Sequence, residues 1–261
     1  MKLDFVKISP AGNTTILITS PVEPRLRAEI SAAVMKDDSV AGEQVGFLVK
    51  PTRSDAAIRL EMMGGEFCAN ATMAACAYLA RRDGIGDTEK TYGIEVSGCP
   101  LPLPAKVRSM DGGYVSRVPM PLPAVFDIIE IRGQSLPVVH LPGISHVIVP
   151  RQWSESFAKD DIRNLAGRVH SDAFGLMFYA NAQMKPFVYV KSTDTAVWEG
   201  ACGSGSAAVA AYLSRSEGES RVSISQPGGV VEAFARCEKG DVRFLSISVR
   251  SLITVEGKVY I

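Results

Sequence analysis

The sequence lacks several features that mark whole classes of protein. Its 261 residues include only three histidines and five cysteines, and no two cysteines form a Cys-x-x-Cys pair. A structural zinc site needs four closely grouped thiolates or imidazoles, so this scarcity argues against one. No P-loop and no Gly-x-Gly-x-x-Gly segment after a strand is present, so the sequence contains neither of these nucleotide-binding motifs. We therefore expect neither a metal ion nor an organic cofactor.

An excess of charge and a long apolar run are also absent. The 28 basic and 28 acidic residues give a formal net charge of zero, so we expect no nucleic acid and no anionic membrane as partner. No stretch approaches the roughly 20 apolar residues that span a bilayer. The charged segment 1–7 is unlike a signal peptide. An odd number of cysteines in a chain of this size is typical of reduced thiols, and we expect a cytoplasmic protein.

What the sequence does contain is a mixture of short apolar runs and alanine-rich stretches. Hydrophobic residues make up 46%, enough for a sizeable core in one large domain or two smaller ones. The clearest predicted strands are 5–8, 15–18, 45–49, 57–62, 138–141, 146–149, 187–190 and 244–249. Helices are predicted at about 69–82 and 203–216, with weaker signals at 29–36 and 154–166.

An internal repeat divides the chain into halves. The segment Cys68-Ala-Asn-Ala-Thr-Met-Ala-Ala-Cys-Ala-Tyr-Leu-Ala-Arg81 aligns without a gap with Cys202-Gly-Ser-Gly-Ser-Ala-Ala-Val-Ala-Ala-Tyr-Leu-Ser-Arg215, and six of 14 positions are identical. Prolines alternate with apolar residues over 118–123, which favours extended chain and indicates a linker. The expected domains are 1–118, to which a final strand at about 250–261 returns, and 119–249. Two unrelated core helices are the alternative explanation.

Each copy of the repeat begins with a cysteine followed by small residues. The first N–H groups of a helix have no intrahelical partner, and the helix dipole favours an anion there. We therefore predict that a substrate carboxylate binds at the residues after each cysteine: Ala69, Asn70, Gly203 and Ser204. The helix dipole also favours a negatively charged thiolate, so a lowered pKa is predicted for the thiols of both cysteines.

Two such cysteines supply what the inversion of a stereocentre requires. A thiolate can remove a proton and a thiol can deliver one, and a pseudo-twofold pair places them on opposite faces of the substrate. Cys68 and Cys202 are accordingly predicted to be the acid–base pair of a racemase or epimerase. A redox pair is an alternative, although a disulfide would block this chemistry. Cys76, Cys99 and Cys237 are interpreted as small buried residues.

These motifs resemble those of the diaminopimelate epimerase-like family over nearly the whole chain. Cys68-Ala-Asn-Ala is similar to the family's Cys-Gly-Asn-Gly, and Ala201-Cys-Gly-Ser-Gly205 to its Ala-Cys-Gly-Thr-Gly. Weaker resemblances lie at 10–13, 41–44, 198–199 and 225–229. The resemblance implies an α/β (α+β) fold of two pseudo-symmetric domains, each a curved mixed sheet wrapped around a central helix. It also implies cofactor-independent catalysis and substrate contacts from Asn13 and Gln44.

Departures from the diaminopimelate epimerase pattern concern the far end of the substrate. Gly200 follows Glu199 where that pattern has an arginine that binds the distal end of the substrate. A second amino-acid head group would therefore lack this binding residue. Glu43 and Glu199 lie near the distal pocket by motif position, and two carboxylates suit an imidazole or an amine. The pattern is similar to that of the histidine racemases that supply D-histidine for opine-type metallophore synthesis. We expect a small amino acid as partner and a homodimer as the candidate assembly.

Other interpretations stay open at this point. Diaminopimelate epimerase, or another amino-acid racemase of the same fold, is one of them. A non-catalytic amino-acid-binding protein on this scaffold is a second, and an isomerase that works through Glu66 or Glu199 is a third. Proline and hydroxyproline racemases fit less well, because they have a histidine where Asn70 stands and an aspartate shortly before the second cysteine.

Overall fold

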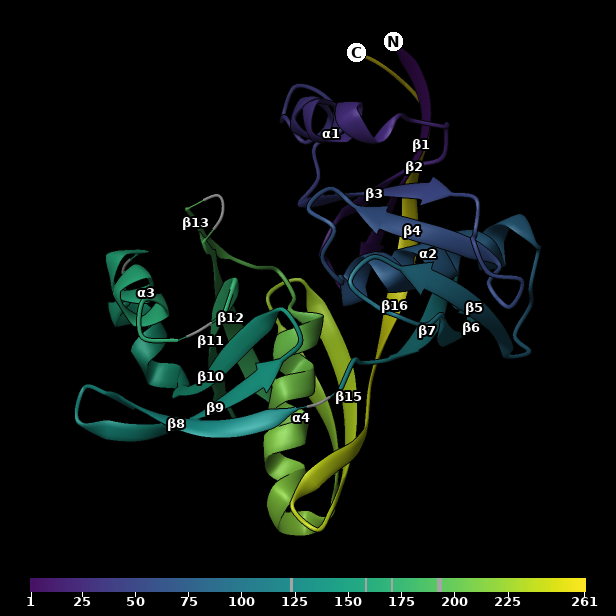
Figure 1. Cartoon of the computed structure of the whole chain (residues 1–261). Helices are drawn as coiled ribbons and strands as arrows, with labels where there is room; N and C mark the ends of the chain where they lie inside the picture. Colours follow the sequence, from purple (N-terminus) through teal and green to yellow (C-terminus); the bar gives the residue numbers. More distant parts are fainter. Residues whose placement is uncertain (123, 158, 170, 192–193) are drawn as a thin grey trace. The chain divides into compact units, whose positions relative to one another are not determined.

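The computed structural model describes residues 1–122, 124–157, 159–169, 171–191 and 194–261. The chain forms two compact units (Figure 1). Unit 1 comprises Met1–Pro119 and Ser248–Ile261, and unit 2 comprises Met120–Ile247. In the described ranges no helix is long and apolar enough to cross a membrane.

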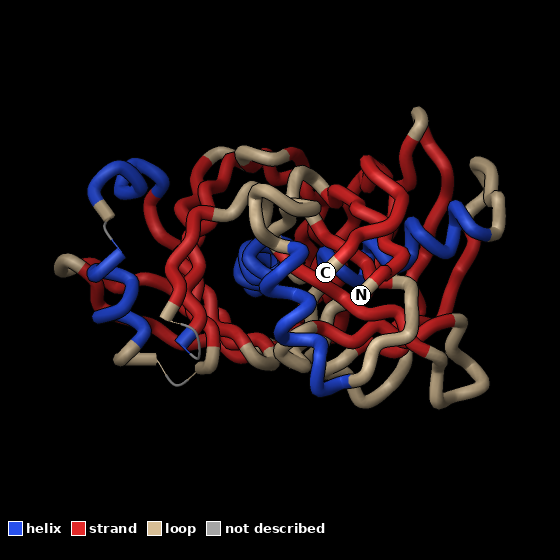
Figure 2. Tube along the Cα trace, turned by 90° about the horizontal axis from the view of Figure 1, so that it is seen from above, coloured by secondary structure: helices blue, strands red, loops and turns tan. Residues whose placement is uncertain are grey.

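Unit 1 is a sheet that closes on itself. Its strands, in chain and sheet order, are β1 (Lys2–Pro10), β2 (Thr15–Ile18), β3 (Gln44–Val49), β4 (Ile58–Met62), β5 (Lys90–Val96), β6 (Leu103–Met110) and β7 (Gly113–Pro119). The long strand β16 (Asp241–Tyr260) enters unit 1 at Ser248, pairs antiparallel with β1 and neighbours β7. The two termini consequently lie side by side (Figures 1 and 2), and the Ile261 N–H donates to the Met1 carbonyl at 2.8 Å.

Helix α2 (Ala69–Arg82) fills the space that this sheet encloses. It contacts every strand from β1 to β7, and all but three of its 14 residues are buried. A helix surrounded in this way must be apolar or small on every face, which explains its run of alanines. Helix α1 (Arg27–Val34), preceded by the 3-10 helix η1 (Pro24–Leu26), covers the outer face of β1, β2 and β3 with Ile30 and Val34. Strand β2 is therefore buried along its whole length.

Unit 2 repeats this plan. Its strands are β8 (Val125–Ile131), β9 (Gln134–Leu141), β10 (Ile144–Pro150), β11 (Ala173–Ala180), β12 (Gln183–Val190), β13 (Thr195–Trp198), β14 (Glu219–Gln226), β15 (Gly229–Glu238) and the first part of β16. The 3-10 helix η2 (Arg151–Ser156) and helix α3 (Lys159–Ala166) cover one face of the sheet. Helix α4 (Gly203–Glu217) packs against β9, β10, β14 and β15, and is seen end-on between strands in Figure 2.

The strand pairings show that the two units are copies of one fold. From β1 to β6 the successive pairings are antiparallel, parallel, antiparallel, parallel and antiparallel. The same sequence of pairings runs through β9, β10, β11, β12, β14 and β15. In each unit the helix that starts with the repeated cysteine connects the fourth strand of this series to the fifth. The expected fold of two related α+β domains is confirmed.

Some local expectations are corrected. The helix predicted over 154–166 is in fact η2 followed by α3, because Phe157 adopts an extended conformation and places its ring edge-on to Phe178 in the core. Strands β7, β8, β11 and β13 lie outside the predicted strands and outside the regions 93–107 and 221–236, which the sequence also predicts as strand. In the predicted linker, β7 ends at Pro119 and the Met120 N–H donates to the Leu245 carbonyl at 2.8 Å, while Pro123 lies outside the described residues.

Candidate active site

Cys68 is the N-cap residue of α2. Its backbone is extended, and its Sγ accepts the Ala71 N–H at 3.4 Å. The Thr72 hydroxyl donates to the Cys68 carbonyl at 2.7 Å, which closes the first turn around the cysteine. Ser97 steadies the segment before it, since its hydroxyl donates to the Glu66 carbonyl at 2.7 Å. The thiol is thus held at the start of the helix, with backbone N–H groups beside it.

Two further predicted residues meet at this thiol. The Cys68 Sγ donates to the Gln44 Oε1 at 2.8 Å, and the Gln44 Nε2 donates to the Asn13 Oδ1 at 2.5 Å and to the Thr15 hydroxyl at 2.9 Å. Asn13 and Thr15 are buried. The structure therefore brings together three motifs that are far apart in the sequence, and it adds Thr15, which sequence reasoning missed.

Strained backbone precedes both amide residues. Ala11 and Gly12, in the tight turn before Asn13, have φ of 48° and 83°, and Ala41, shortly before Gln44, has φ of 55°. Alanine rarely adopts this left-handed region, so the surrounding fold must stabilise it. Such strain concentrates at functional sites, and here it lies at the two loops that present Asn13 and Gln44.

The other unit 1 candidates differ in exposure. Ala69 and Asn70 are buried in the first turn of α2, as an anion-binding role requires. Glu43 and Glu66 have exposed side chains. Glu43 is fixed through its backbone, whose N–H donates to the Thr14 carbonyl at 3.0 Å. The residue is exposed at the surface, but partial desolvation of its carboxyl raises the pKa of Glu43 above its ordinary value.

Cys202 repeats the arrangement at the start of α4. It too is an extended N-cap residue, and its Sγ accepts the Gly205 N–H at 3.4 Å. The Ser206 hydroxyl donates to the Cys202 carbonyl at 2.8 Å, as Thr72 does in unit 1. Gln226, which sequence reasoning missed, accepts the Cys202 N–H at 2.8 Å and donates to Ser206 at 2.9 Å. It lies in the segment 225–229, one of the weaker resemblances to the family motifs.

Glu199 acts directly on the Cys202 thiol. Its segment is held in place because the Glu199 N–H donates to the Pro186 carbonyl and the Gly228 N–H donates to the Gly200 carbonyl. Burial raises the pKa of the Cys202 thiol well above its ordinary value, and the charge of the hydrogen-bonded Glu199 carboxylate raises this pKa further. The expectation of a lowered pKa at a helix start is wrong for Cys202, because desolvation and Glu199 outweigh the N–H donors.

We expect that Glu199→Gln speeds the alkylation of Cys202 by iodoacetamide at neutral pH. Removing the negative charge lowers the thiol pKa, and the alkylation rate follows the thiolate fraction. Mass spectrometry of the modified peptide measures the rate for each cysteine, and Cys68 is the internal control. A Cys202 rate that is unchanged or lower would contradict this account of the thiol.

His146 is a second group that reaches Cys202. Its Nε2 lies 2.9 Å from the Ser204 hydroxyl, which in turn lies 3.5 Å from the Cys202 Sγ. The imidazole is fully buried, and burial lowers its pKa to about 3, so it is neutral at physiological pH. Sequence reasoning gave His146 no role, because its partner Ser204 is 58 residues away in the chain and only folding brings the two together.

The remaining cysteines have other environments. Cys76 and Cys237 are buried, and Cys99 is half-buried. Burial raises the pKa of the Cys76 thiol to about 12 and that of Cys99 to about 11. Among the described residues, no group of three or more histidine, cysteine, aspartate and glutamate side chains could hold a metal ion. Cys68 and Cys202 are set apart by their helix-start positions and polar partners.

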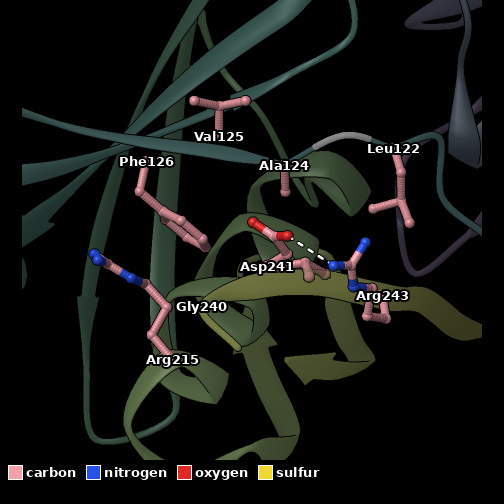
Figure 3. Close-up of a pocket in the computed structure, with 9 residues that line it drawn as sticks. Leu122, Ala124, Val125, Phe126, Arg215, Gly240, Asp241 and Arg243 are labelled. Atoms are coloured by element: carbon pink, nitrogen blue, oxygen red, sulfur yellow. Dashed lines mark hydrogen bonds and ion pairs between the residues drawn. The ribbon is translucent and has the colours of Figure 1, made fainter. Parts of the chain in front are cut away.

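Unit 2 contains a cavity of about 670 Å³ whose described lining includes no cysteine (Figure 3). Phe126 at the start of β8, Arg215 near the end of α4 and the turn between β15 and β16 line it. The Arg215 guanidinium covers the Phe126 ring, and Arg243 pairs with Asp241. Cys202 stands at the opposite end of α4, about 20 Å along the helix axis from Arg215. This cavity is therefore separate from the surroundings of Cys202.

Comparison with known proteins identifies the family to which the chain belongs. The family model described as histidine racemase CntK N-terminal domain matches residues 2–260. The chain belongs to this family. The histidine racemase of Fusobacterium nucleatum is 35% identical over 269 residues, which cover 99% of this chain and 97% of the relative. That of Staphylococcus aureus is 25% identical over 271 residues, covering 99% and 98%. Membership makes the protein an isomerase of the racemase and epimerase class.

Solved structures share the fold at low identity. A probable proline racemase from Agrobacterium radiobacter K84 superimposes with a TM-score of 0.74 at 11% identity, covering 99% of this chain and 92% of that one. A predicted epimerase from Pseudomonas aeruginosa gives a TM-score of 0.73 at 12% identity, covering 99% of both chains. These similarities show the fold, while the substrate has to be argued from the family and the residues of the site.

Proposed function

We propose that this member of the histidine racemase family interconverts L- and D-histidine, with Cys68 and Cys202 as the two acid–base groups. One observation carries the mechanism: both thiols cap a buried helix in the same way, each with its Sγ accepting the third N–H at 3.4 Å. Two equivalent acid–base groups are what inversion at one carbon needs. The full-length match to histidine racemases favours histidine among amino acids.

The proton transfers balance over one turnover. The raised pKa of Cys202 favours its neutral thiol, so we take Cys202 as the acid. Cys68 then acts as the base once its own thiol has lost the proton that it donates to Gln44. Cys68 takes the α-proton as the Cα–H bond breaks and an S–H bond forms. Cys202 then gives its proton to the opposite face of Cα and becomes a thiolate. The enantiomer so formed is converted back with the two roles exchanged.

The helix starts would stabilise the intermediate carbanion. Charge that develops at Cα spreads into the substrate carboxylate, where backbone N–H groups of the two first turns would hold it. Ala69 and Gly203, the residues next to the cysteines, are small and buried, so a carboxylate can approach their backbone closely. Asn70 would add a side-chain donor, and Ser204 its backbone N–H. The donors are fixed before the reaction and need no reorganisation during it.

We assign the imidazole of the substrate to Glu43. Glu199 is already hydrogen-bonded to the Cys202 thiol, whereas the Glu43 carboxylate is exposed on the loop that ends at Gln44. A carboxylate can accept an imidazole N–H, which would favour histidine over an apolar amino acid. Free thiols require a reducing compartment, so we place the enzyme in the cytoplasm, where its D-histidine would serve metallophore synthesis.

The test is solvent exchange at Cα. L-Histidine incubated with the enzyme in D₂O, without pyridoxal phosphate, is expected to give D-histidine that carries deuterium at Cα, followed by NMR and chiral chromatography. L-Proline and meso-diaminopimelate serve as comparison substrates. Rapid exchange with one of these compounds and none with histidine would overturn the assignment of histidine as the substrate. Histidine binding by calorimetry with no exchange would instead indicate a non-catalytic binding protein.

A further inference from the structure

A hydrogen-bonded chain leads from a buried histidine to one of the two thiols. His146 lies on β10, with its Nε2 2.9 Å from the Ser204 hydroxyl, and that hydroxyl lies 3.5 Å from the Cys202 Sγ. Gly175 faces His146 in the parallel register of β10 and β11. A Cβ added to Gly175 would come within 2.5 Å of the His146 Nδ1, so a side chain there would displace the ring. The lack of a side chain at Gly175 thus provides the space that this imidazole occupies.

The burial of the second ring nitrogen determines where the proton resides. The His146 Nδ1 is buried and has no hydrogen-bond partner within the described ranges. A buried N–H without an acceptor is more costly than a bare lone pair, so the neutral ring carries its proton on Nε2. Nε2–H then donates to the Ser204 oxygen. The Ser204 hydrogen is left to point at the Cys202 Sγ.

We infer that His146 is a positioning residue, which acts through Ser204 to direct a hydroxyl hydrogen at the Cys202 sulfur and so stabilises the thiolate. This inference rests on the proposed function, in which Cys202 becomes a thiolate each time it donates its proton. The Gly205 N–H is a second donor to the same sulfur, at 3.4 Å. On the other side the Glu199 carboxylate accepts a hydrogen bond from the neutral thiol and disfavours the thiolate.

The hydrogen bonds described at Cys68 differ from this arrangement. Asn70 stands where Ser204 stands in the repeat, and the Cys68 thiol donates to the Gln44 amide oxygen. The two thiols therefore sit in different hydrogen-bond environments although their helix caps are equivalent. Groups whose surroundings differ in this way can hold different protonation states at one pH, which a two-base reaction requires at its start.

The test compares His146→Leu with His146→Gln in the full-length protein. Glutamine can place an amide N–H near the position of the histidine Nε2, whereas leucine fills space and donates nothing. We expect His146→Leu to slow the alkylation of Cys202 by iodoacetamide at neutral pH about 10- to 100-fold, the range for a lost hydrogen bond to a charged group. Cys68 should react at the unchanged rate, and His146→Gln should recover most of the loss.

The direction of the change separates positioning from a merely structural role. Loosened packing would expose the buried Cys202 and speed its alkylation, whereas loss of the directed hydroxyl slows it. Ser204→Ala is expected to slow the reaction to the same degree, and Ser204→Ala combined with His146→Leu should be no slower than either alone. A Cys202 rate that is unchanged or faster in His146→Leu would overturn the inference.

NMR of the wild-type protein provides a measurement that needs no variant to fold. In ¹⁵N-labelled enzyme the His146 ring is expected in the Nε2–H form, assigned by the loss of its signals in His146→Gln or, if that variant is unfolded, by their perturbation in Ser204→Ala. The Nδ1–H form would overturn the inference. Alkylation and ring NMR require no turnover, so their outcome is independent of whether histidine is the substrate in the exchange experiment.

Discussion

Replacing either Cys68 or Cys202 by serine is expected to lower kcat/KM for racemisation by about 10²–10⁴-fold, the usual contribution of a general acid or base. Serine keeps the cap geometry and its N–H acceptor, but its hydroxyl is a far weaker acid than a thiol. The value of kcat/KM should fall by the same factor for the L-to-D and the D-to-L conversion, because the two enantiomers of the substrate have the same free energy. Circular-dichroism assays from each enantiomer measure the two rates.

A matched control comes from the repeat itself. Cys76→Ala substitutes a buried cysteine of the same helix by the residue that its counterpart, Ala210, already has in α4. It should retain activity. If Cys68→Ser and Cys202→Ser both keep more than a tenth of the activity, the two-base mechanism is wrong. A loss in Glu66→Gln with unimpaired cysteine variants would point to a carboxylate isomerase.

Gly205→Ala is expected to destabilise the protein by about 1–3 kcal/mol and to lower kcat/KM at least tenfold. Alanine is the better helix former by about 1 kcal/mol, so helix propensity alone predicts the opposite sign. However, a Cβ at Gly205 would overlap the Sδ of Met177, which is fully buried on β11, and such overpacking costs about 1–3 kcal/mol. Relief of the overlap would shift the Gly205 N–H away from the Cys202 Sγ.

A double-mutant cycle with Met177→Ala tests this cause. Met177→Ala alone should cost about 2–5 kcal/mol, because it leaves a cavity. In the double variant the new methyl group has room, so the total should be less than the sum of the single changes. Denaturant unfolding gives the free energies. Strict additivity, or a Gly205→Ala variant as stable and active as the wild type, would show that Met177 does not restrict this position.

Position 205 also illustrates the limit of the repeat as a guide. Its counterpart in unit 1 is Ala71, which is fully buried in α2 and donates its N–H to Cys68 as Gly205 does to Cys202. Alignment of the two copies alone would therefore permit alanine at 205. The difference arises from a methionine on a neighbouring strand, 28 residues earlier in the chain, which the alignment does not include.

Sequence by itself determined the features that are local or repeated. The repeat at Cys68 and Cys202 predicted the two helices and their cysteine N-caps, because the small residues and the periodicity that fix a helix start lie within one turn of it. It also predicted the two related domains, whose matching order of strand pairings the structure shows. The Asn13 and Gln44 motifs were named from the sequence, although only folding brings them to the same thiol.

Tertiary structure alone decided the electrostatic character of each thiol. A helix start favours the thiolate wherever it occurs, and the sequence could report no more than that. How deeply Cys202 is buried, that Glu199 bonds to it, and that His146 reaches it through Ser204 depend on which strands pack around α4. Desolvation and hydrogen bonding act over a few ångströms in space, and residues that are neighbours in space here are distant in the chain.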